Sequence, residues 1–307
     1  MKKEVPVHSN LKPILLTAAA VLFIIFVIGP LVLVLFDSSK TGNVAVIPIN
    51  GPITGDGSSY LGQSTTSSQQ VVGFIQEAGK NSNVKVIVLE INSPGGSAVA
   101  SDEIASAVKK SEKPVIAVIR EVGASGGYWI ASAANHIIAN RMSITGSIGV
   151  ISSYLEFSKL MEEYGVRYER LVSGKYKDSG TPFKSLTGEE RTILQGKMDK
   201  IHTFFINEIA VNRNMDPAKV RELATGEFFL GAEALDLGLV DELGDMSTAE
   251  DYIKMNYGIE QIDAVRYEKK SGLLDLLTGV FSDFSFHIGE GIGSSVLQQQ
   301  EYPLQLR

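Results

Sequence analysis

The stretch VKVIVLEINSPGG at residues 84–96 decides the fold class. Its first part, residues 84–91, is rich in β-branched apolar residues, which predicts a strand that is buried on both faces. Residues 98–110 predict a helix, and the apolar run PVIAVI at residues 114–119 predicts a second buried strand. Strands that alternate with helices across glycine-rich loops predict an α/β fold with a mostly parallel sheet.

The same alternation continues on both sides of this stretch. Residues 44–49 predict a strand, residues 51–68 a flexible loop rich in Gly and Ser, and residues 71–78 a helix. The sequence TGEE at residues 187–190 is typical of a helix start with acidic residues in the first turn. The further expected elements are strands at 136–139 and 167–172, helices at 156–164, 187–212, 217 onward and 248–256, and a strand, helix and turn within 228–241.

The composition excludes several classes of protein and of site. With 307 residues, 44% of them hydrophobic and 21% charged, the chain is an ordinary globular one. Its net charge of −7 argues against binding to nucleic acid. The absence of cysteine excludes disulfides, thiolate zinc sites and a cysteine nucleophile. The four histidines (His8, His136, His202 and His287) lie far apart, so we expect no metal and no other cofactor.

The first forty residues predict a membrane anchor. The run from Ile14 to Phe36 is apolar and uncharged, and at 1.5 Å per residue it reaches about 34 Å, enough to cross a bilayer. Lys2, Lys3 and Lys12 precede it, so we expect residues 1–13 in the cytoplasm and the chain beyond the anchor outside it. A cleaved signal peptide is the alternative, but the run is long for one and no A-x-A-like site follows.

Two glycine-rich loops are the candidate site. Residues 93–96 (SPGG) and 123–127 (GASGG) follow the two predicted buried strands, and loops at the carboxyl ends of parallel strands usually carry the chemistry. Paired glycines let backbone N–H groups converge on one point, which is what an oxyanion hole requires. Ser125 would then be a nucleophile facing these donors. The plainer alternative is that the glycines only allow tight turns and that Ser125 only caps a helix.

A serine nucleophile needs a base, and the residues leave two types open. The string GASGG fits the G-x-S-x-G pattern of α/β-hydrolases, for which Asp241 with His287 would be the best available pair. His136 is expected in a strand, and His202 is expected to pack or to face solvent on a helix.

A lysine base is the second type. It would have to lose its proton, which desolvation or a nearby positive charge favours. Lys175 and Lys177 lie in a glycine-flanked loop that could fold into a cleft. Either lysine could equally be a solvated surface charge.

Five ordered motifs closely resemble the signal peptide peptidase A family, over roughly residues 44–260. They are NSPGG (92–96), GASGGYWIA (123–131), TGSIGV (145–150), YKDSGTPF (176–183) and GAEALDLGLVDELG (231–244). The resemblance implies a ClpP/crotonase-like fold and a membrane-anchored serine protease with a Ser–Lys dyad, which degrades released signal peptides and other apolar peptides.

The resemblance also implies roles for individual residues. Ser125 is the implied nucleophile, Lys177 the implied general base and Ser147 the serine that orients the lysine. The amides of Gly126 and of Gly95 or Gly96 are the implied oxyanion hole, with the choice between Gly95 and Gly96 left open. Long members of the family carry two copies of this fold, with the dyad split between them. A single copy therefore implies a homo-oligomer, an octameric ring, in which Lys177 of one subunit reaches Ser125 of the next.

These expectations define the domain organisation and its alternatives. We expect an anchor at 14–36, a linker at 37–43, a peptidase domain at 44–267 and a flexible or regulatory tail at 268–307. The alternatives are a related membrane serine protease associated with stomatin-like proteins, an α/β-hydrolase esterase, and a non-catalytic scaffold.

Overall fold

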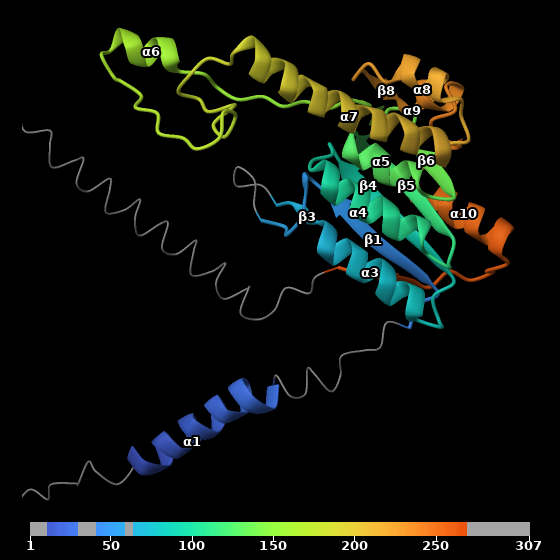
Figure 1. Cartoon of the computed structure of the whole chain (residues 1–307). Helices are drawn as coiled ribbons and strands as arrows, with labels where there is room; N and C mark the ends of the chain where they lie inside the picture. Colours follow the sequence, from blue (N-terminus) through green and yellow to red (C-terminus); the bar gives the residue numbers. More distant parts are fainter. Residues whose placement is uncertain (1–10, 30–40, 59–63, 269–307) are drawn as a thin grey trace, which may run out of the picture. The chain divides into compact units, whose positions relative to one another are not determined.

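The computed structural model describes residues 11–29, 41–58 and 64–268 (Figure 1). The chain divides into two compact units, Met1–Val265 and Arg266–Arg307. Only three residues of the second unit are described, so the expected tail at 268–307 lies almost wholly outside the described residues. The account below concerns the first unit.

A mostly parallel sheet forms the centre of this unit, as the sequence predicts. Its strands run in the order β10-β1-β4-β5-β6-β9, and β7 pairs with both β5 and β8. Only the β7–β8 pair is antiparallel among the pairs described. The strands are β1 (Val44–Asn50), β4 (Val86–Ser93), β5 (Val115–Ala124), β6 (His136–Ala139), β7 (Ile144–Gly146), β8 (Phe228–Leu230), β9 (Glu242–Leu243) and β10 (Ala264–Arg266).

Helices cover both faces of the sheet, which explains why its central strands are continuously apolar. Side chains alternate along a strand, and one set, which includes Val46, Val88 and Val118, packs against α10 (Met246–Tyr257). Helices α3 (Ser68–Lys80), α4 (Ala98–Lys109) and α5 (Gly126–Ser132) lie side by side along the sheet (Figure 1). The core of the unit is therefore fixed around β4 and β5, the two strands that lead to the candidate loops.

Strand β5 is longer than the sequence predicts. Its first half pairs with β6 and its second half, Val122–Ala124, pairs with β7. The first two residues of the glycine-rich loop at 123–127 thus belong to the sheet, and α5 begins only at Gly126. Ser125 is the single residue between strand and helix.

Residues 150–187, here called the arm, differ from the rest of the unit. The arm contains one short helix, α6 (Ser158–Glu163), and leads into the long helix α7 (Gly188–Asn212) (Figure 1). No residue from 151 to 189 is buried. The expected strand at 167–172 is wrong: these residues are exposed and form no regular structure, because an isolated strand has no partner for its backbone hydrogen bonds.

The remaining elements are short or lie at the ends of the unit. Two residues of β2 (Ile53–Thr54) pair with β3 (Thr66–Ser67) inside the loop expected at 51–68, of which residues 59–63 lie outside the described part. Helices α8 (Pro217–Leu223) and α9 (Gly231–Asp236) follow α7.

The amino-terminal segment holds α1 (Leu11–Phe23) and a π-helical turn, η2 (Ile24–Ile28). Within residues 11–29, 41–58 and 64–268, no helix has the length and apolar character needed to cross a membrane. The described residues thus do not support the expected span at 14–36, of which residues 30–36 lie outside them.

Candidate active site

Ser125 occupies a strained backbone position between β5 and α5. Its φ of 50° and ψ of −121° lie in a region that residues with a side chain rarely adopt and that costs on the order of 1–3 kcal/mol. The Ser125 N–H donates to the Gly146 carbonyl at 2.8 Å, and the Ser125 carbonyl accepts from Trp129 N–H at 2.9 Å. The strand β7 and the helix α5 therefore hold this serine from both sides, as a nucleophile at a strand-to-helix turn requires.

The loop after β4 packs directly against Ser125. Gly95 has a φ of 96°, and a side-chain carbon added there would lie 2.9 Å from Ser125 Cβ and 2.6 Å from Gly126 N. A carbon added at Gly96 would lie 2.2 Å from the Ile53 carbonyl oxygen. Only glycine fits at either position. The glycines that the sequence singles out are thus required for close approach of three backbone segments.

The hydrogen bonds of this loop distinguish Gly95 from Gly96. Gly95 N–H donates to Ser93 Oγ at 3.1 Å, so it is already used. A parallel bridge joins Ile53 to Gly96, but its two bonds use the Gly95 carbonyl and the Ser97 N–H. Among the described residues, Gly96 N–H has no acceptor.

Gly126 supplies a second donor close to the first, since its N–H has no acceptor in the part of the chain that the structure describes. It is the first residue of α5, so its N–H has no acceptor within the helix. A carbon added at Gly126 would lie 3.3 Å from Gly96 N, which places the two amides next to each other. Two adjacent free N–H groups beside a serine hydroxyl form a geometry that can stabilise an oxyanion.

Ser147 follows β7 and also has a positive φ, of 49°. Its N–H donates to the Glu227 carbonyl at 2.8 Å, and its hydroxyl donates to the Gly226 carbonyl at 3.3 Å. The segment before β8 thereby fixes Ser147, while one side of its hydroxyl oxygen remains able to accept.

One pocket of about 720 Å³ brings most of these residues together. Ser125, Gly96, Gly126 and Ser147 all line it. Its opposite wall comes mainly from α7, with Trp129 of α5 stacked on Phe205 at a centroid distance of 4.6 Å. The larger apolar side chains of the lining are those of Trp129, Val150, Ile151, Met198, Ile201 and Phe205.

Lys177 does not line this pocket. It lies on the arm, is exposed, and its side chain has no hydrogen bond or ion pair with any described residue. Lys175, the other lysine of the loop, binds Glu189 at 2.6 Å, and this hydrogen bond raises the pKa of Lys175 above its usual range. Lys175 is thus held in its charged form, whereas Lys177 is free to interact elsewhere.

Of the alternative histidine bases, His136 lies in a strand, as the sequence predicts. His136 lies in β6 and contacts Glu242 at 3.1 Å, away from the pocket. Asp241 binds Arg213 at 2.6 Å; burial opposes its charge, but the bond from Arg213 keeps the pKa of Asp241 below its usual range. His287, its expected partner, lies outside the described residues.

His202 lines the pocket, which the sequence analysis did not foresee. Its Nε2 is buried and has no hydrogen-bond partner among the described residues, and the same holds for Trp129 Nε1. The helical period of α7 carried the signal, because residues 195, 198, 202 and 205 recur on one face.

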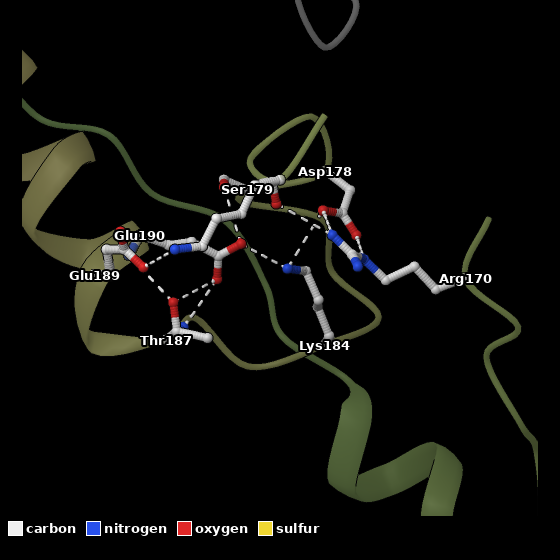
Figure 2. A network of polar contacts seen from close by, with 8 residues as sticks. Arg170, Asp178, Ser179, Lys184, Thr187, Glu189 and Glu190 are labelled. Atoms are coloured by element: carbon white, nitrogen blue, oxygen red, sulfur yellow. Dashed lines mark hydrogen bonds and ion pairs between the residues drawn. The ribbon is translucent and has the colours of Figure 1, made fainter. Parts of the chain in front are cut away.

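The sequence analysis also missed a network of charges around Lys177. Figure 2 shows Arg170, Asp178, Lys184 and Glu190 joined through the base of the arm. The TGEE motif at 187–190 does start a helix, as predicted, and Thr187 and Glu190 form a capping box. The same Glu190 carboxylate also binds Lys184, which no local pattern reveals.

Comparisons with known proteins identify the family of this chain. The sequence model of peptidase family S49 matches residues 107–260, which include Ser125, Ser147 and Lys177. The chain is 30% identical to "Putative protease MJ0651" of Methanocaldococcus jannaschii, over 79% of this chain and 76% of that protein. It is 32% identical to "Putative signal peptide peptidase SppA" of Enterococcus faecium, over 76% and 69%. It is also 32% identical to "Serine protease SPPA, chloroplastic" of Arabidopsis thaliana, over 76% of this chain and 35% of that protein.

Proposed function

Because the chain belongs to peptidase family S49 and is a serine protease, we propose that Ser125 is its nucleophile and that Lys177 of a neighbouring copy is its general base. One observation carries this proposal. The pocket holds a serine, two free amides and a second serine, whereas Lys177 lies outside it, exposed and without a partner among the described residues. The site of a single chain lacks the proposed base, and the arm carries that base on an exposed surface.

The proposed chemistry follows from these groups. The neutral amine of Lys177 takes the proton of Ser125 as its Oγ attacks the scissile carbonyl carbon. The amides of Gly96 and Gly126 donate to the oxygen that becomes negative. The tetrahedral intermediate collapses, the C–N bond breaks, and the lysine returns its proton to the leaving amine. Water then cleaves the acyl ester with the same base.

Ser147 is the proposed positioning residue for the lysine. Its backbone is fixed by Glu227, and its hydroxyl lines the pocket that Ser125 also lines. A hydroxyl that accepts from the amine directs the nitrogen lone pair toward Ser125. Exclusion of water when an arm closes over the pocket favours the neutral amine.

The proposed substrates are apolar peptides, including released signal peptides. The apolar wall from Trp129 to Phe205 supports this class, because it would bury apolar side chains on one side of the scissile bond. The proposed location is the outer face of a membrane, with residues 14–36 as the anchor. Its support is the apolar side chains that α1 and η2 expose. A crotonase-like fold, a ring of subunits and, as the alternative, a protease associated with a stomatin-like protein are proposed from the resemblance of the five sequence motifs.

The test uses the full chain in detergent, with casein and a synthetic signal peptide as substrates. We expect Ser125→Ala and Lys177→Ala each to lose at least about 10⁴-fold in kcat, and their mixture to recover activity. Lys175→Ala is the matched control and should stay within twofold. If Lys177→Ala remains active, the proposed base is wrong.

His202 is the rival base, because it lines the pocket. His202→Gln therefore accompanies the test. Should it abolish activity while Lys177→Ala does not, a histidine base acts within one chain. If all three variants remain active, the site itself is wrong.

A further inference from the structure

Four charged side chains close to Lys177 in the sequence form a network of hydrogen bonds and ion pairs. Arg170 binds both oxygens of Asp178, with Nη2 to Oδ1 at 2.8 Å, and also reaches the Lys175 carbonyl at 3.2 Å. Lys184 lies 3.4 Å from Asp178 and 2.6 Å from Glu190. Two carboxylates and two cations thus alternate in space over one short loop (Figure 2).

Glu190 is the centre of this network. Its side chain is only 4% exposed. One carboxylate oxygen accepts from Ser179 at 2.9 Å and from Lys184, and the other accepts from the N–H of Thr187 at 2.9 Å. The bond from Lys184 lowers the pKa of Glu190 to about 2. A buried carboxylate with all its acceptor sites used fixes the groups around it.

The residues held by the network surround Lys177 on both sides. Asp178 and Ser179 follow it directly and are tied to Lys184 and Glu190, and the Lys175 carbonyl before it is tied to Arg170. The Lys177 N–H donates to the Gly174 carbonyl at 3.2 Å. Its backbone is therefore fixed at every neighbouring residue, while its side chain is left exposed and unpaired among the described residues.

We infer that Arg170, Asp178, Lys184 and Glu190 form a mount whose purpose is to present Lys177 to the pocket, with Glu190 and Lys184 as positioning residues for the proteolytic reaction. This inference rests on the proposed role of Lys177. Because Glu190 belongs to α7, the mount ties the lysine loop to the helix that forms the pocket wall. Glu190 is 12 residues from His202, or about 18 Å along the helix axis. The mount thus fixes the lysine loop to α7 of its own chain, and so determines how Lys177 projects toward the pocket of the neighbouring copy.

A second ion pair in the same loop serves as a control for the Lys184–Glu190 pair. Lys175 and Glu189 form an ion pair of the same type, at the same distance of 2.6 Å, one residue away in sequence from Glu190. Their side chains are 68% and 54% exposed, against 23% and 4% for Lys184 and Glu190. The two pairs therefore differ in burial and in connection to Asp178, not in charge or in location.

The experiment compares the two pairs in the full chain in detergent. We expect Glu190→Gln and Lys184→Met to lower kcat on the signal peptide at least tenfold, with KM changed less than twofold. Glu189→Gln and Lys175→Met should leave both constants within twofold. Lys184→Arg, which keeps a cation beside Glu190, should retain more activity than Lys184→Met. Equal effects from both pairs, or a loss confined to KM, would overturn the inference.

Mixing separates a positioning role from a general loss of structure. If the mount serves only Lys177, Glu190→Gln subunits still offer an intact Ser125. Their mixture with Ser125→Ala subunits should recover activity, whereas their mixture with Lys177→Ala subunits should not. Recovery in neither mixture means that Glu190 supports the fold as a whole, and the inference is then wrong.

The outcomes also separate this inference from the function on which it rests. If the Lys177→Ala protein is active, Lys177 is not the general base, whatever the activities of the network variants. If Lys177→Ala is inactive and Glu190→Gln is fully active, the proposed base stands and only the positioning role of the mount is wrong.

Discussion

The sheet around Ser125 and the arm around Lys177 are organised in opposite ways. Ser125 is held by buried strands, close backbone contacts and a strained φ, and its neighbours from Gly126 to Ser132 are all buried. The arm has no buried residue from 151 to 189 and is held by ion pairs at its base. Because packing holds the proposed nucleophile and ion pairs hold the loop of the proposed base, we expect the two regions to respond to different perturbations.

The largest difference between the two regions is expected in the free energy of unfolding that is lost when an apolar side chain is truncated. Leu89 in β4 is fully buried, and Leu89→Ala should lower the free energy of unfolding by about 2–5 kcal/mol. Leu171 in the arm is 98% exposed, and Leu171→Ala should change it by less than about 0.5 kcal/mol. Denaturant titrations followed by fluorescence of the single tryptophan, Trp129, measure both values. Similar values would mean that the arm is packed against something that the single chain does not contain.

The next effect concerns activity rather than stability. Ser147→Ala should lower kcat by about 10- to 100-fold, because a misdirected base loses part of the 10²–10⁴-fold that general-base catalysis contributes. Its melting temperature should change little, since the backbone of Ser147, not its side chain, makes the shorter bond to Glu227. Ser153→Ala, on the exposed arm, is the control. Unchanged kcat in Ser147→Ala would remove this serine from the mechanism.

A smaller effect on stability should appear at Ser125, the proposed nucleophile with the strained backbone. Ser125→Gly should abolish activity and yet raise the free energy of unfolding by about 1 kcal/mol, because glycine adopts a positive φ without strain. Ser125→Ala keeps the strain and should not be stabilised. Thermal unfolding of the two variants side by side tests this. Equal melting temperatures would show that the conformation of Ser125 costs nothing.

The smallest expected effect is a loss of stability that is limited to the arm and appears only at acidic pH. The network lowers the pKa of Glu190 from 4.5 to about 2 and also lowers the pKa of Asp178. A carboxyl group with a lowered pKa stabilises the fold fully above its unfolded value and loses this contribution as the pH falls toward the folded value. Pepsin should thus cleave the arm faster at pH 2 than at pH 4, while Trp129 fluorescence stays constant. In Glu190→Gln the rates at the two pH values should differ less.

The sequence predicted the sheet and the two glycine-rich loops because both depend on local patterns. The alternation of apolar strands with helices predicted β1, β4, β5 and β6 to within a few residues, and the glycine pairs at 95–96 and 126–127 do meet beside Ser125. Register and backbone hydrogen bonds cannot be predicted this way. The choice of Gly96 over Gly95 as the free donor depends on the Ser93 hydroxyl, which accepts from the Gly95 N–H and donates its own proton to the carbonyl of Gly51, more than 40 residues earlier in the chain.

The arm was predicted less well, for a physical reason. Residues 167–172 have the composition of a strand, but a strand needs a partner, and none is described beside them. Glu190 was read correctly as part of a helix start, but its buried contacts with Lys184 and Ser179 join residues that share no periodic pattern. Ion pairs between loops have no signature in a single sequence, so the surroundings of Lys177 could only be found in the structure.

The bridge between Ile53 and Gly96 has a consequence for how this site can be dissected. The free donor at Gly96 is a peptide N–H in a position where any side chain would collide with Ile53. Replacing Gly96 by alanine would therefore distort the loop and still leave the N–H in place. The activity lost in such a variant would measure the distortion and not the contribution of the donor. Exchange of that amide for an ester, by semisynthesis, would replace the N–H by an oxygen atom and so remove the donor without adding a side chain. The rate lost in such a molecule is the direct measure of what this backbone group contributes.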